Sequence, residues 1–159
     1  IDGSGHMGRL VQLVAASEGL ETDDNIISFE SKRIKRVVTS SSGCELLALQ
    51  RAVKGTYRTV EACKRLWPGI KVRYLVDNEP ILNQVKAGRC AEEPRLECIA
   101  KYIAQELAAV GETLERVPTE TMKADCLTKQ MQQRHGFCAG GVDSLLSPTG
   151  GVVVACLAN

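Results

Sequence analysis

The chain has few aromatic residues and few histidines, and its charges nearly cancel. Its 159 residues include one Trp, three Tyr, two Phe and two His, with 20 basic and 19 acidic side chains. So few aromatics argue against a binding face built on stacked bases. With a net charge of +1, attraction to a polyanion has to come from local clusters of Lys and Arg. The remaining composition is that of an ordinary globular protein, so we expect a single domain over residues 1–159.

Close pairs of metal-binding residues are also missing. None of the seven cysteines forms a C-x-x-C pair, and His6 and His135 lie far apart, whereas a structural zinc site needs close ligand pairs. Scattered cysteines mostly act as small core residues, which suits a reducing compartment. No apolar run approaches the ~20 residues of a membrane span, and no signal peptide is visible. We therefore expect a soluble, intracellular protein with no membrane contact.

The order of the expected elements indicates an α/β fold with a mixed sheet. Apolar patterns predict strands over 9–17, 25–38 (one strand or two), 70–76, 113–117 and 152–158, and helices over 44–66, 79–86, 94–110 and 121–133. The cluster Thr39 to Gly43 is expected to cap the long helix, and Trp67-Pro68-Gly69 to stop it. Strand–helix–strand passages imply partly parallel pairing covered by helices. We expect a core over about 8–133, a connection over 134–151 and a terminal strand over 152–158.

The strand Val72 to Val76 is followed directly by Asp77 and Asn78. In open α/β sheets, the carboxyl ends of strands face the crevice in which ligands bind, so a polar pair at this point can belong to a site. The alternative is that Asp77 and Asn78 only cap the helix that follows.

Four carboxylates occupy positions that such a fold could bring together. Asp2 lies near the start, Glu45 in the first turn of the long helix, Asp77 at a strand end and Asp125 near the start of the last helix. Their mutual repulsion would be costly unless a cation neutralised them. Oxygen ligands suit Mg²⁺ or Mn²⁺, and two such ions can activate water against a phosphodiester. Taken singly, each acid is a solvated charge or a cap; their joint placement carries the prediction.

Several motifs resemble the ribonuclease H family, and most closely the ribonuclease H domain of Copia-type retrotransposon reverse transcriptases. They are IDGS near the start, SKRIKRVVTSSSGCEL from Ser31 to Leu46, the strand end YLVDN, and VPT followed by ADCLTK from Ala124 to Lys129. The resemblance covers about residues 26–131, and the last motif is the most specific. It implies a mixed five-stranded sheet flanked by helices, dependence on two Mg²⁺ or Mn²⁺ ions, and cleavage of the RNA strand of RNA–DNA hybrids. It also implies a polymerase partner and a cytoplasmic (retroelement particle) or nuclear location.

The same resemblance assigns catalytic and metal-binding roles to Glu45, Asp77, Asp125 and Asp2. In the family, the fourth acid ends the first, central strand. Asp2 fits its motif, but only Ile1 precedes it, so the alternative is that the true acid lies upstream of this chain. VVVACLAN followed by IDGS would read as one continuous first strand. We therefore hypothesise that the segment from Val152 to Ala158 fills the central position; the alternatives are an edge strand or a disordered tail.

A basic run precedes the long helix, and its members are predicted to contact hybrid phosphates by charge and groove shape. Its alternative role is a solvated strand face. Arg95 could likewise meet a phosphate or pair with Glu92 or Glu97. The predicted nucleic-acid contacts are Lys32, Arg33, Lys35, Arg36, Asn78 and Arg95. Two rival functions remain at this point: a degenerate domain that binds nucleic acid or packs on a polymerase without cutting, and an integrase or resolvase that cuts DNA.

Overall fold

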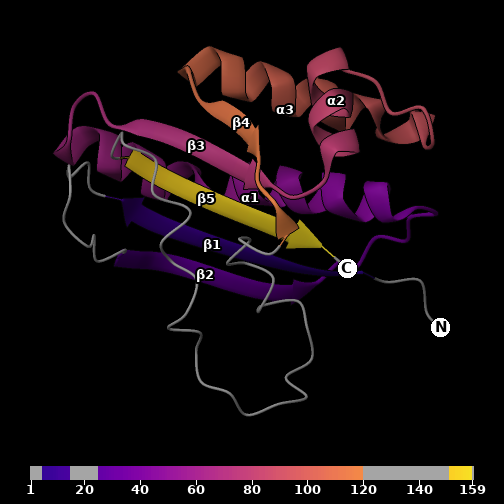
Figure 1. Ribbon diagram of the computed structural model, residues 1–159, viewed down its shortest axis with the longest axis horizontal. Coiled ribbons are helices and arrows are strands. Elements are labelled where there is room, and N and C mark those ends of the chain that lie inside the picture. The colour runs from indigo at the N-terminus through magenta and orange to yellow at the C-terminus, as the bar shows by residue number, and fades with distance from the viewer. Residues whose placement is uncertain (1–4, 15–24, 120–150, 159) are drawn as a thin grey trace, which may run out of the picture.

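The computed structural model describes residues 5–14, 25–119 and 151–158, which form a mixed α/β structure (Figure 1). Five strands of these ranges make one sheet in the order β2-β1-β5-β3-β4. The pairs β2–β1 and β1–β5 are antiparallel, whereas β5–β3 and β3–β4 are parallel. The strands are β1 (His6–Val14), β2 (Asn25–Arg33), β3 (Lys71–Val76), β4 (Thr113–Arg116) and β5 (Gly151–Ala158), and the helices are α1 (Ser41–Leu66), α2 (Glu79–Ala87) and α3 (Glu97–Val110), with a 3₁₀ turn η1 (Pro94–Leu96) before α3.

The C-terminal strand β5 lies in the centre of the sheet, between β1 and β3 (Figure 1). Val154 pairs with Val11 of β1 on one side and with Tyr74 of β3 on the other. Its side chain is fully buried. The hypothesis that the segment 152–158 occupies the central position is therefore confirmed, and the edge-strand and tail alternatives are excluded.

The antiparallel side of the sheet differs from the prediction in its boundaries. Strand β1 begins at His6 rather than at residue 9, and β2 is one strand that ends at Arg33 rather than at residue 38. The chain leaves the sheet at Ile34, whose N–H donates to the carbonyl of Gly5 at 2.8 Å. Ile34 and Val38 are nevertheless buried, so their apolar character reflects core packing, not a second strand.

The ends of helix α1 agree with the prediction from its polar capping residues and its helix-breaking residues. The Ser40 side chain accepts a hydrogen bond from the Gly43 N–H at 3.0 Å, which caps the first turn. At the other end, the Trp67 N–H donates to the Cys63 carbonyl, and Gly69 adopts a φ of +87° that suits glycine.

Two side chains of α1 are placed differently from the prediction. Because the helix starts at Ser41, Glu45 lies just beyond the first turn rather than within it. Tyr57, expected on the buried stripe, is 57% exposed. A tyrosine at the margin of an apolar stripe can keep its ring partly in contact with the core while its hydroxyl remains in water.

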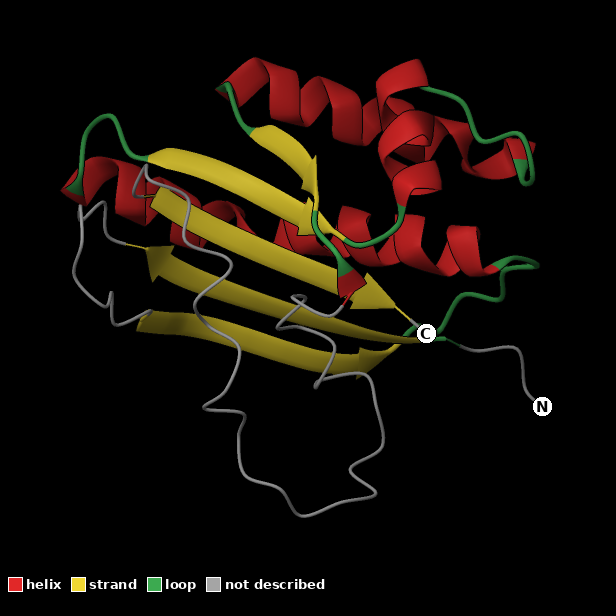
Figure 2. Cartoon of the chain, viewed as in Figure 1, coloured by secondary structure: helices red, strands yellow, loops and turns green. Residues whose placement is uncertain are grey.

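The core lies between the sheet and the helices (Figure 2). Helix α1 packs against β5 and β1, α3 packs against α1, and α2 packs against α3 and β4. The residues predicted to point inward from the helix after Pro94 are all buried, namely Leu96, Ile99, Ile103 and Leu107. No helix in the described ranges combines the length and apolarity that crossing a bilayer requires. Because α1 packs against the central strand β5, the position of its first turns relative to the sheet is fixed by this contact.

Candidate functional site

Glu45 and Asp77 come together although they are far apart in the chain. Asp77 follows β3 directly, and β3, β4 and β5 are parallel, so their carboxyl ends share one edge of the sheet, here called the carboxyl edge. Glu45 comes from α1, one turn after its N-terminus. The Glu45 carboxylate lies close enough to Asp77 to feel its charge, and it hydrogen-bonds the side chain of Asn78. The structure therefore places Glu45 within electrostatic range of Asp77.

The environment of Glu45 favours its neutral form. Burial raises the pKa of the Glu45 carboxyl, and repulsion from Asp77 raises it further, to about 7 in spite of the opposing hydrogen bond from Asn78. At neutral pH the Glu45 carboxyl is therefore only partly ionised. A nearby cation would shift it toward the ionised form. Carboxyls with pKa values moved toward 7 are characteristic of functional sites.

Asp77 is bonded by the last residue of β4 and by the segment that follows β4. Thr119 Oγ1 donates to Asp77 Oδ2 at 3.3 Å, and Arg116 Nε donates to the Asp77 carbonyl at 3.5 Å. The Val117 N–H extends the strand pairing by donating to the Val76 carbonyl at 2.8 Å. These bonds hold the end of β4 beside Asp77.

Asn78 does not act as the simple helix cap that was the alternative for this strand end. It occupies the N-cap position of α2, but its side chain makes no capping hydrogen bond. Its side chain instead bonds Glu45. The Asp77-Asn78 pair therefore links β3 to α1.

The other two predicted acids, Asp2 and Asp125, lie outside the described residues. The central strand β5 has the sequence GVVVACLA, without a carboxylate. Among the residues that the structure describes, no group of three or more His, Cys, Asp or Glu side chains could hold a metal ion. The described part of the site therefore supplies two carboxylates and an amide.

The predicted basic residues begin at the same edge of the sheet. Strand β2 runs in the direction of β5, and the register aligns Arg33 with His6 next to the pair Met7–Ala158. Lys32 and Arg33 are exposed at the end of β2, and Lys35 and Arg36 are exposed in the loop that follows. The basic run is thus placed toward the edge that carries Asp77, with β1 and β5 lying between β2 and β3.

Arg95 makes an intramolecular ion pair. Its guanidinium lies 3.1 Å from Glu93 Oε2, rather than from Glu92 or Glu97, and it also donates to the Val37 carbonyl at 3.3 Å. Glu93 could not be identified as this partner from the sequence, because it falls in a polar stretch expected to be a loop. The bond from Arg95 to the Val37 carbonyl joins residues that lie 58 positions apart in the sequence.

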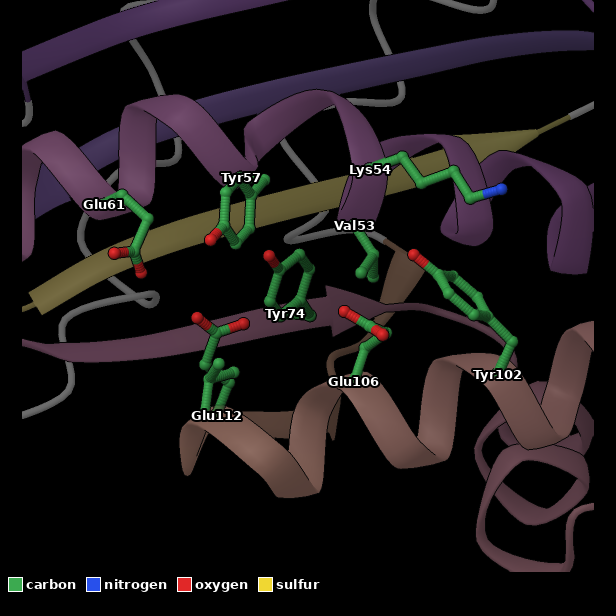
Figure 3. Close-up of a pocket in the computed structure, with 9 residues that line it drawn as sticks. Val53, Lys54, Tyr57, Glu61, Tyr74, Tyr102, Glu106 and Glu112 are labelled. Carbon is green, nitrogen blue, oxygen red and sulfur yellow. The ribbon is translucent and has the colours of Figure 1, made fainter.

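A separate hollow of about 260 Å³ lies between α1 and α3 (Figure 3). Tyr57, Tyr74 and Tyr102 line it together with Glu61, Glu106 and Glu112. Lys54 lies over the ring of Tyr102, 4.9 Å from its centroid, so one cation of this chain already occupies an aromatic face there. None of the predicted site residues lines this hollow.

Comparison of the chain with protein-family models, with curated proteins and with solved structures found no match. The function has to be argued from the residues and their placement.

Proposed function

We propose that this protein is a divalent-metal-dependent endonuclease of the ribonuclease H type, which hydrolyses the RNA strand of RNA–DNA hybrids. The observation that carries the proposal is the meeting of Glu45 from α1 with Asp77 and Asn78 at the carboxyl edge. The sequence motifs that resemble the Copia-type ribonuclease H domain lie around these same residues. The order of the strands supports the ribonuclease H fold, with β5 in the central position that the first strand takes in that family.

The donor set fits Mg²⁺ or Mn²⁺. Glu45 and Asp77 offer carboxylate oxygens, the ligands that both ions prefer. A Glu45 carboxyl with a pKa of about 7 fits as well, because a cation would offset the burial and the repulsion from Asp77 that raise this pKa. When bound, the metal would supply an activated water and stabilise the leaving oxygen of the phosphodiester. Glu45 and Asp77 would hold it; we propose Asp125 and Asp2 as the further ligands.

The chain's own residues would bind the substrate by its backbone. Lys32, Arg33, Lys35 and Arg36 form an exposed basic run at the carboxyl edge, suited to phosphates. Recognition of this kind depends on charge and groove shape rather than sequence, and the 2′-hydroxyl distinguishes RNA from DNA. We therefore expect cleavage of hybrids without strong sequence preference.

The test is cleavage of an RNA strand, labelled at one end, within an RNA–DNA hybrid in millimolar Mg²⁺. We expect products that end in a 3′-hydroxyl, no cleavage in EDTA, and at least a hundredfold loss of rate in Asp77→Asn. The matched control is Glu92→Gln, which changes an exposed acid outside the site and should leave the rate within twofold. Activity that survives Asp77→Asn would refute the assignment, and cleavage of duplex DNA but not of hybrid would favour an integrase or resolvase.

A second function is favoured by one observation, the absence of any carboxylate from the central strand β5. A domain that keeps the fold and the basic run but lacks a complete metal site would bind hybrid, or pack against a polymerase, without cutting it. Hybrid binding that depends on Lys35 and Arg36, without cleavage in Mg²⁺ or Mn²⁺, would support this second function.

A further inference from the structure

Glu93 is a buried carboxylate that binds the polypeptide just before α1. Its side chain is 3% exposed. One oxygen, Oε1, accepts four hydrogen bonds: from the N–H and hydroxyl of Thr39 at 2.6 and 2.7 Å, and from the N–H and hydroxyl of Ser40 at 2.9 and 3.1 Å. Such charge-assisted bonds are roughly twice as strong as neutral ones. The two residues that lead into α1 are thus held by a single carboxylate from another part of the chain.

The second oxygen of Glu93 is also occupied. Arg95 Nε and one terminal nitrogen donate to Oε2 at 3.2 and 3.1 Å. The same guanidinium donates to the Val37 carbonyl. Glu93 and Arg95 therefore hold the whole approach to α1, from Val37 to Ser40, against the segment before α3.

The fit between Glu93 and the first turn of α1 leaves no spare room. A methyl group at Gly43 would lie 2.9 Å from Glu93 Oε1 and 3.2 Å from its carboxyl carbon. Gly43 also donates to the capping Ser40 hydroxyl. Because Glu45 is only two residues beyond Gly43, any movement of this turn would move Glu45 relative to Asp77.

We propose that Glu93 is a positioning residue for the candidate site: by fixing the first turn of α1, it holds Glu45 beside Asp77. Two effects disfavour the ionised Glu45 side chain in this position, namely its loss of hydration on burial and its repulsion from Asp77. The hydrogen bond from Asn78 opposes them at the carboxylate, and the Glu93 contacts oppose them at the backbone. This role rests on the proposed function for its catalytic consequence, but its effect on cation binding can be measured separately.

The experiment compares Glu93→Gln and Glu93→Ala with Glu92→Ala, which removes the exposed neighbouring acid. Mn²⁺ binding is measured by isothermal titration at a temperature well below the Tm of each variant, beside hybrid cleavage. We expect Kd for Mn²⁺ to rise at least tenfold in Glu93→Ala, less in Glu93→Gln because one amide oxygen still accepts, and not at all in Glu92→Ala. The cleavage rate kcat should fall in the same order.

The outcomes separate the two proposals. A lower Tm with unchanged Kd and kcat in Glu93→Gln would overturn the positioning role, because a purely structural residue affects stability alone. If Glu93→Ala does not fold, Glu93→Gln decides. A wild-type chain that binds Mn²⁺ but cuts no hybrid would refute the proposed function, and a Kd that still rises in the Glu93 variants would then sustain the positioning role.

Discussion

Replacing Glu45 with Gln should stabilise the metal-free protein at pH 8. In the wild type, folding at this pH holds an ionised carboxylate half-buried and beside Asp77, which is why its pKa is raised to about 7. Gln has almost the same shape, carries no charge and can keep a hydrogen bond with Asn78. The variant therefore removes an unfavourable interaction without leaving a cavity. Stabilisation by mutation of a site residue is the usual sign that function and stability compete at that position.

The size of the effect follows from the pKa. A pKa of about 7 in place of the ordinary 4.5 would correspond to roughly 3 kcal/mol of unfolding free energy if the group were wholly buried, at ~1.4 kcal/mol for each pH unit. Glu45 keeps some contact with water, which screens its interaction with Asp77. We therefore expect Glu45→Gln to gain about 1–2 kcal/mol at pH 8.

The pH dependence has a definite sign. The folded state binds the Glu45 proton more tightly than the unfolded state, so wild-type stability falls as pH rises from about 4.5 to about 7. Below this window both proteins have a neutral side chain at position 45, and their difference should vanish. Glu93, whose pKa is lowered to about 2 chiefly by its hydrogen bond with Thr39, stays ionised throughout and does not disturb the comparison.

The assay is urea unfolding of both proteins at pH 4.5, where their difference should be small, and at pH 8, in EDTA and then in Mg²⁺. Millimolar Mg²⁺ should stabilise the wild type at pH 8 and have less effect on Glu45→Gln, because only the wild type offers the carboxylate that the ion would bind. Equal or lower stability of the variant at pH 8 in EDTA, or a difference that does not change with pH, would refute the reasoning.

Three further changes test the fold. Tyr74→Phe removes a buried hydrogen bond of 3.0 Å with Thr56 Oγ1 and should cost about 1 kcal/mol in urea unfolding; no cost would show that the bond is not stabilising. Gly43→Ala should lower the Tm although Ala favours helices, because its methyl group would press on Glu93; a raised Tm would show that the turn has room. Truncation before Gly151 removes the central strand and should abolish cooperative unfolding, whereas an unchanged thermal transition would contradict the observed sheet order.

The long helix and the central parallel strand could be predicted because their signals are local. Apolar residues recur along α1 with helical spacing, serines precede it, and Trp67-Pro68-Gly69 ends it. The strand β3 is a short apolar run followed by Asp77. Parallel pairing then predicts that the end of β3 and the start of α1 lie at the same edge of the sheet. The proximity of Glu45 and Asp77 could be predicted on this ground as well.

Contacts between distant residues could not be predicted in the same way. The Glu93 carboxylate meets Thr39 across 54 positions, and the sequence near Glu93 reads only as a polar stretch before a proline. The end of β2 at Arg33 differs from the prediction for a related reason, because Ile34 and Val38 are apolar for core packing rather than for strand pairing. The role of Asn78 toward Glu45 likewise depends on α1 crossing the sheet.

Glu45 and Glu93 show how one residue type serves two purposes in the same protein. The protein compensates the charge of Glu93 with backbone N–H groups, hydroxyls and a guanidinium, and its pKa falls to about 2. It gives Glu45 one amide and an opposing carboxylate, and its pKa rises to about 7. A carboxylate whose charge the fold already compensates gains less from a bound cation than one that the fold leaves under-compensated. The contrast is the physical reason for assigning a positioning role to Glu93 and chemistry to Glu45, although Glu93 is the more buried of the two.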